Sequence, residues 1–101
     1  MTNKTVLDVL IKARKMIKNP QNWCQGAFHN VTARRNSYCA MGAVSFAAIA
    51  LKCKPYGAFP VLAAALPDGG NARDLVHYND THAHAEVLAL FDAAIANETT
   101  Q

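Results

Sequence analysis

The chain has 101 residues and a mass of 10.9 kDa, which fits one domain and leaves no room for a second independent core. Hydrophobic residues make up 51% of it and charged residues 17%, a globular composition that can bury a core without a metal or disulfides, so we expect no cofactor. The net charge of +3 is modest, and no apolar run is long enough for a transmembrane helix.

A first helix is predicted over residues 5–18. Thr5 is a candidate N-cap, and Val6, Leu10, Ala13 and Ile17 recur at helical spacing. Its basic residues form one face against a single nearby acid, and they are Lys4, Lys12, Arg14, Lys15 and Lys18. A solvated face is the simpler interpretation, and nucleic-acid binding through this helix is the weaker alternative.

From Trp23 to Tyr38 the helical spacing of apolar residues stops. The weak alternation of apolar and polar residues in this connection favours a loop or a short two-stranded hairpin. Trp23 is the only tryptophan, and we expect it to be largely buried as the anchor of this polar segment.

A central helix is predicted over residues 38–52, with Ser37 as its N-cap. Its apolar residues point to every side, which is typical of a helix surrounded by others. Gly42 lies inside this helix, where glycine costs about 1 kcal/mol relative to alanine. We therefore expect Gly42 to touch another backbone or a ligand.

Two further helices complete the prediction. Residues 60–66 form a short helix with proline in its first turn, and residues 81–96 form a last helix capped by Asp80 or Thr81. The intervening segment 75–78 is interpreted as a brief extended or turn segment. The expected fold is mainly α, a compact bundle of about four helices with a short loop or β-hairpin between the first two.

Cys39 is the first candidate for chemistry. At the start of a helix its sulfur lies near unpaired backbone amides and the positive end of the dipole, which favour the thiolate. A buried cysteine that behaves as a small hydrophobe is the more common case, and we favour it.

A thiol-dependent enzyme is the alternative. Cys39 would need a base and an orienting group, for which His77 and Asp80 are the candidates. Against this, helix capping explains the run Asn79, Asp80 and Thr81 without any substrate.

No metal site is predicted. His82 and His84 are two residues apart, so they would point to different sides of a helix, and no paired Cys-x-x-Cys is present. Cys24, Cys39 and Cys53 are an odd set without a signal peptide before them, so we expect free thiols and a cytoplasmic protein.

Three short blocks carry a resemblance to a known family. They are Trp23-Cys24-Gln25-Gly26, Cys39-Ala40-Met41-Gly42-Ala43 and Tyr78-Asn79-Asp80. The chain resembles a family of small uncharacterised bacterial and phage proteins, a domain of unknown function, with Trp-x-Gln-Gly, Cys-Ala-x-Gly-Ala and Trp-Asn-Asp blocks. Tyr78 stands where that pattern has tryptophan.

The resemblance implies one recurring constellation and no activity. With the neighbouring aromatic it gives the pocket candidates Trp23, Gln25, Gly26, Cys39, Gly42, Tyr78, Asn79 and Asp80. These residues lie at or just before the starts of the predicted central and last helices, where backbone amides are able to hold a small anionic or polar ligand.

The leading functional prediction is a small non-enzymatic binding or regulatory protein that acts through a protein partner or through self-association, for example as a homodimer. Its low charge, which leaves apolar surface uncovered, is the reason. A role as an accessory protein of a phage or mobile element follows from the resemblance alone. Nucleic acid and membranes are not expected partners.

Overall fold

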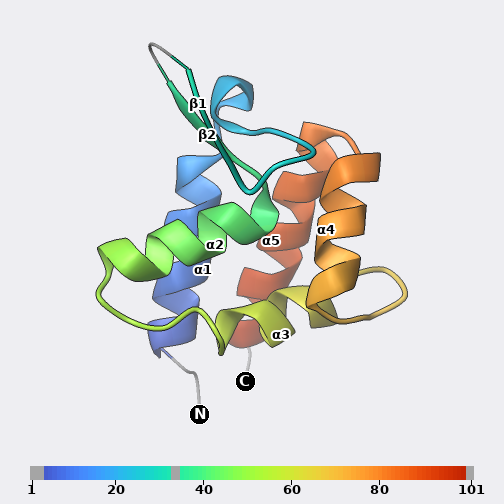
Figure 1. Ribbon diagram of the computed structural model, residues 1–101. Helices are drawn as coiled ribbons and strands as arrows, with labels where there is room; N and C mark the ends of the chain where they lie inside the picture. The colour runs from blue at the N-terminus through green and yellow to red at the C-terminus, as the bar shows by residue number, and fades with distance from the viewer. Residues whose placement is uncertain (1–3, 33–34, 100–101) are drawn as a thin grey trace.

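The computed structural model describes residues 4–32 and 35–99. They form five α-helices, a 3-10 turn and a two-stranded antiparallel hairpin (Figure 1), namely α1 Lys4–Met16, η1 Pro20–Asn22, β1 His29–Val31, β2 Asn36–Tyr38, α2 Ala40–Ala50, α3 Ala58–Ala64, α4 Ala72–Thr81 and α5 His84–Thr99. The predicted mainly helical fold is confirmed, and of the two alternatives predicted between the first two helices, a loop or a hairpin, the structure has the hairpin. The correction is one further helix, α4.

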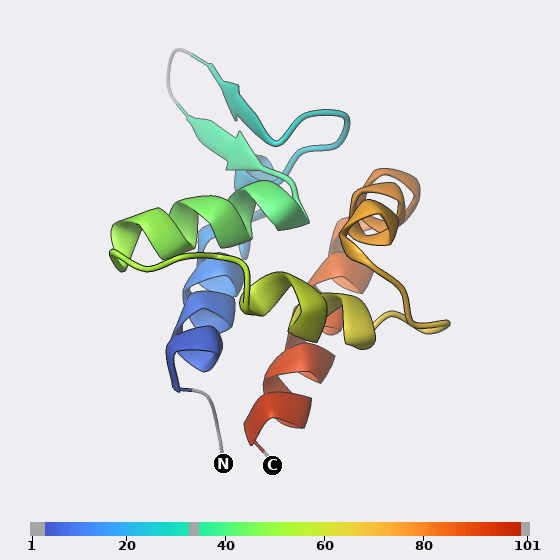
Figure 2. The ribbon, with the colours of Figure 1, turned by 60° about the horizontal axis from the view of Figure 1, so that its bottom comes forward.

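Helices α1 and α5 lie side by side and run in opposite directions (Figure 2). Their facing sides are fully buried, as at Leu10 and Phe91, which have no exposed surface. At the edge of this pair Arg14 Nε donates to Asp92 Oδ1 at 2.5 Å. Thr5, expected to cap the first helix, lies inside α1, which begins one residue earlier.

Helix α2 packs against α1, and Ala43, Val44 and Ala47 of α2 are completely buried. The prediction that it is surrounded on all sides is wrong for its end. Ile49 is 67% exposed and Leu51, just beyond the helix, is 42% exposed, because the last turns of α2 project past the other helices (Figure 1).

The cap of α2 is Cys39 rather than Ser37. Ser37 is paired with Asn30 in the hairpin, and its hydroxyl donates to the Asn30 carbonyl at 3.4 Å. Strand β2 therefore runs almost directly into α2, and the extended residue between them, Cys39, takes the N-cap conformation.

Helix α4 occupies residues that the sequence interpretation assigned to a turn and to the start of the last helix. A capping box starts it, because Asn71 accepts from the amide of Asp74 while the Asp74 carboxylate accepts from the amide of Asn71. Asp80 and Thr81 consequently end α4 instead of capping α5. The first turn of α5 is held by Glu86, which accepts from the amide of Ala83 at 3.0 Å.

Candidate functional site

Asn79 lies at the centre of the constellation and is only 1% exposed. Its Oδ1 accepts from Trp23 Nε1 at 2.7 Å and from the amide of Ala40 at 3.0 Å. Its Nδ2 donates to the carbonyl of Cys24 at 3.0 Å and to Asp80 Oδ1 at 3.1 Å. A carboxamide has two donor hydrogens and two acceptor lone pairs, so the side chain of Asn79 is fully satisfied inside the fold.

The residues on either side extend this network. Gln25 Nε2 donates to the carbonyls of Asn79 and His82, at 3.1 and 3.0 Å. The amide of Gly26 donates to Asp80 Oδ1 at 2.9 Å, in a backbone conformation with φ of +81° that favours glycine. We call Trp23, Gln25, Gly26, Asn79 and Asp80 the Asn79 cluster. It fastens the segment after η1 to the end of α4 and the start of α2.

Trp23 is partly buried and packs against the hydrophobic core. Its indole N–H faces Asn79, and its ring lies 5.4 Å from the ring of His84, measured between centroids. His84 is fixed in turn, since its Nε2 lies 2.6 Å from the carbonyl oxygen of Ile17 at the end of α1. The tryptophan therefore serves as the expected anchor, although part of its surface remains open.

Cys39 caps α2 with its sulfur, which accepts from the amide of Gly42 at 3.3 Å. The residue is 2% exposed. Burial raises the pKa of the Cys39 thiol above its ordinary value, and this outweighs the lowering by the amides of Gly42 and Met41. Cys39 thus makes the amide contacts expected at a helix start, but the net direction of its pKa shift is opposite to the one that these contacts favour.

Gly42 makes the close backbone approach that the sequence predicts. A Cβ at this position would lie 1.8 Å from the carbonyl oxygen of Phe28. The same oxygen accepts from the amide of Cys39 at 3.2 Å. Glycine is thus required so that the segment entering β1 can lie against the first turn of α2.

The first turn of α2 does not offer free amides for an anion. The amide of Ala40 donates to Asn79, the amides of Met41 and Gly42 face the sulfur of Cys39, and the amide of Ala43 makes the first helical bond to the Cys39 carbonyl. The polar groups that the sequence places at this helix start are used by the fold itself.

The three candidates for catalysis do not border one cavity. Cys39 and Asp80 line a cavity of about 170 Å³, together with residues 26–28 and Val76. His77 lies on α4 with an exposed side chain and lines a different, larger cavity with Tyr78. The structure thus brings Cys39 and Asp80 together and places His77 elsewhere.

Among the described residues, no three His, Cys, Asp or Glu side chains come close enough to hold a metal ion. The cysteines at positions 24, 39 and 53 are free thiols. None of the helices in residues 4–32 and 35–99 has the length and hydropathy needed to cross a membrane.

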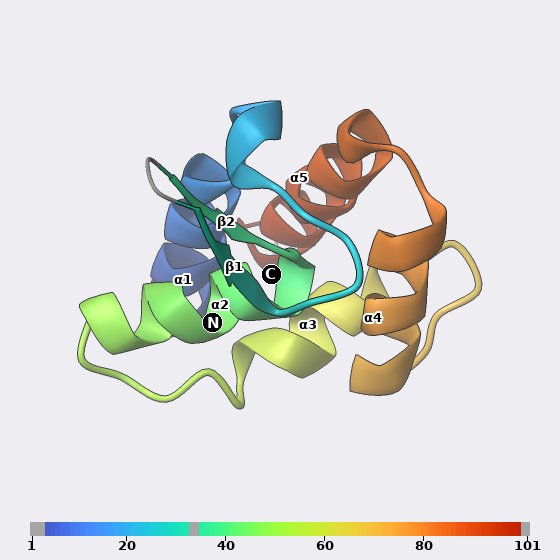
Figure 3. The ribbon, with the colours of Figure 1, turned by 45° about the horizontal axis from the view of Figure 1, so that its top comes forward.

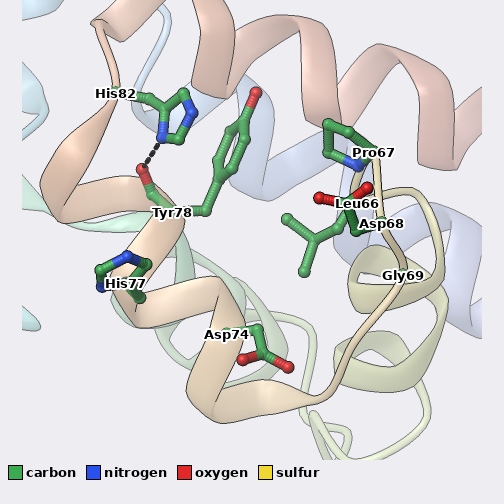
Figure 4. Close-up of a pocket in the computed structure, with 8 residues that line it drawn as sticks. All are labelled: Leu66, Pro67, Asp68, Gly69, Asp74, His77, Tyr78 and His82. Carbon is green, nitrogen blue, oxygen red and sulfur yellow. Dashed lines mark hydrogen bonds between the residues drawn. The ribbon is translucent and has the colours of Figure 1, made fainter.

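The larger cavity is the part that sequence reasoning missed. It has a volume of about 340 Å³ and lies between residues 66–69 and the outer side of α4, where Asp74, His77, Tyr78 and His82 line it (Figure 4). The sequence signal for α4, from which this cavity follows, was the pair Asn71 and Asp74 at capping-box spacing.

The fold and the Asn79 cluster together define a small helical domain. In it one buried asparagine of α4 joins the segment between η1 and β1 to the start of α2. The chain belongs to a family of unknown function, DUF6197, whose model matches residues 1–97. This confirms the resemblance to a domain of unknown function. No curated protein and no solved structure matches the chain.

Proposed function

We propose that this chain is a small non-enzymatic binding protein that self-associates through the open edge of strand β1. The observation that carries the proposal is the unequal use of the two edges of the hairpin. One edge is occupied by the chain itself, and the other presents unpaired peptide groups beside an exposed valine.

The outer edge of β2 is occupied. The carbonyl of Tyr38 accepts from the amide of Cys24 at 3.0 Å, and the carbonyl of Asn36 accepts from the side chain of Asn22 at 2.9 Å. Figure 3 shows η1 and the following segment on this side of the hairpin. A further strand therefore has no place beside β2.

The outer edge of β1 is different. In the register His29↔Tyr38, Asn30↔Ser37, Val31↔Asn36, the bonds at the two ends of the hairpin, from Thr32 to Arg35 and from Cys39 to Phe28, alternate with outward-facing positions. The N–H and C=O groups of His29 and Val31 thus point away from β2. Among the described residues they have no hydrogen-bond partner.

A second copy of this chain is the occupant that we propose. Strand β1 contains no Asp, Glu, Lys or Arg, and Val31 is 65% exposed. In an antiparallel pair of β1 strands, His29 of one copy lies opposite Val31 of the other, so the outward groups satisfy each other. This pairing also carries the two hairpin tips, each with an exposed Arg35, to opposite ends of the joined sheet, where the like charges are well separated.

The internal saturation of the Asn79 cluster supports a non-enzymatic role over the thiol-dependent alternative. A catalytic Cys39 needs an ionisable, accessible thiol with a base in reach. The thiol here is buried and its pKa is raised, and His77 lines a different cavity. A cytoplasmic location is part of the proposal, supported by three free thiols. A phage or mobile-element origin has only the sequence resemblance behind it.

Light scattering coupled to size exclusion tests the association, over concentrations up to about 1 mM, where weak complexes form. We expect concentration-dependent dimers, with amides of His29 and Val31 that exchange more slowly as concentration rises. Val31→Lys places a charge on the edge and should give monomers. Ile49→Lys, at an equally exposed aliphatic residue on α2, is the matched control and should still dimerise.

Two results would overturn the proposal. One is a wild-type chain that stays monomeric throughout this range. The other is loss of the dimer in the Ile49→Lys variant but not in the Val31→Lys variant, which would place the interface on α2.

A further inference from the structure

The cavity on the outer side of α4 has no role in the proposed association. It lies between residues 66–69, which follow α3, and the side chains of Asp74, His77, Tyr78 and His82 (Figure 4). Its volume of about 340 Å³ is within the range of sites for small ligands. We call it the Tyr78 cavity.

Tyr78 forms one wall of this cavity. Its ring is stacked on the imidazole of His82, with centroids 3.8 Å apart and planes inclined by 16°. His82 is held by its Nδ1, which lies 2.9 Å from the Tyr78 carbonyl oxygen. Figure 4 shows the tyrosine ring standing between His82 and the loop that carries Pro67 and Asp68. One face of the ring is therefore covered, and the other faces the cavity.

Two carboxylates line this cavity, and only one of them is already hydrogen-bonded within the fold. The Asp74 carboxylate accepts from the amide of Asn71 in the capping box at 2.9 Å. The Asp68 side chain has no hydrogen-bond or ion-pair partner among the described residues and lies on the loop opposite the tyrosine ring. An exposed carboxylate across a gap from an aromatic face is the arrangement that binds an organic cation.

The surrounding charge favours the same ligand. Residues 9–67 carry eight basic side chains and no acidic one, whereas residues 68–101 carry six acidic side chains and only one basic one, Arg73. Helices α4 and α5 thus form an acidic part of the molecule. Burial, together with the nearby Glu86 carboxylate, raises the pKa of Tyr78, so its phenol stays neutral.

We propose that the Tyr78 cavity binds the ammonium or guanidinium group of an organic cation, with the group stacked on the open face of Tyr78 and paired with Asp68. The apolar side chains of Leu66 and Pro67 would contact the aliphatic part of the ligand. The cation belongs either to a free amine or to a lysine or arginine side chain of a peptide, since both present the same group.

Calorimetric titration of the full chain with agmatine, which carries both cationic groups, tests the proposal. We expect a Kd of about 1 mM or tighter in low-salt buffer. Asp68→Asn should weaken binding about tenfold. Tyr78→Leu should weaken it about threefold to thirtyfold. Asp8→Asn, which removes the same charge on α1, is the matched control and should change the Kd less than about twofold.

A second arm distinguishes the sources of the cation. N-acetyl-arginine amide presents the guanidinium as a peptide does, and tighter binding than agmatine assigns the cavity to protein side chains, while weaker binding assigns it to free amines. Circular dichroism checks that each variant is folded, and Asp68→Asn, at an exposed loop position, keeps the test valid if Tyr78→Leu does not fold. The proposal is overturned if agmatine does not bind, if 1-pentanol binds equally well, or if Asp68→Asn and Asp8→Asn weaken binding equally.

Discussion

Replacing Asn79 by alanine tests the central structural claim, that one buried carboxamide joins three separate segments. The substitution removes four hydrogen bonds and leaves the amide of Ala40, the indole N–H of Trp23 and the carbonyl of Cys24 without their partner. Each net hydrogen bond contributes about 0.5–1.5 kcal/mol, and an unsatisfied buried group costs about 1–3 kcal/mol.

Because water can reach the half-buried Trp23 and Cys24 but not the buried start of α2, we count the full penalty only for Ala40. The expected loss of unfolding free energy is then about 3–7 kcal/mol, a large fraction of the 5–15 kcal/mol typical of small domains. Asn79→Asp should also destabilise, since it retains the acceptor but places a second carboxylate beside Asp80.

Urea unfolding measures this loss, followed by circular dichroism and by the fluorescence of Trp23, whose indole touches the substituted group. Gln21→Ala, at an exposed residue whose side chain makes no hydrogen bond within the described chain, is the matched control and should change stability by less than about 0.5 kcal/mol. A loss below about 1 kcal/mol for Asn79→Ala, with an unchanged denaturant slope, would refute the claim that the cluster holds the fold together.

Three further predictions concern the start of α2. Cys39 should react with iodoacetamide more slowly than either other cysteine, and mass spectrometry of labelled peptides measures this; faster labelling of Cys39 would restore the enzyme interpretation. Because the unfolded thiol ionises near 9.0 and the folded thiol above it, stability should fall as pH rises through that value. Gly42→Ala should destabilise by about 1–3 kcal/mol despite alanine's higher helix propensity, because its Cβ meets Phe28; a thermal melt at or above the wild-type midpoint would contradict this.

The helical spacing of apolar residues, together with the residues that start and stop helices, was sufficient to predict most of the helices. The stripe Val6, Leu10, Ala13 and Ile17 predicted α1, and all four residues are buried. A glycine inside an apolar helix correctly indicated a close backbone approach. These signals are local. The spacing of apolar residues in a helix repeats every few residues, and the lower helix propensity of glycine acts at the glycine itself.

Helix α4 was missed because its sequence is mixed and mostly polar, with Leu75 and Asn79 as its buried residues. Its only clear local signal is the capping box. A helix of this kind is stabilised by what its few buried side chains contact rather than by propensity. In α4 the key contact, from Trp23 to Asn79, spans 56 residues of sequence.

Composition and periodicity by themselves predicted a small, mainly helical chain with a loop or a hairpin after its first helix, and the short blocks indicated its family. Only the tertiary structure decided what those blocks do. Whether Asn79 binds a ligand or its own chain depends on which groups surround it, and whether Cys39 ionises depends on burial, which outweighs the local amides. Both are properties of packing between distant segments, and no pattern of neighbouring residues encodes them.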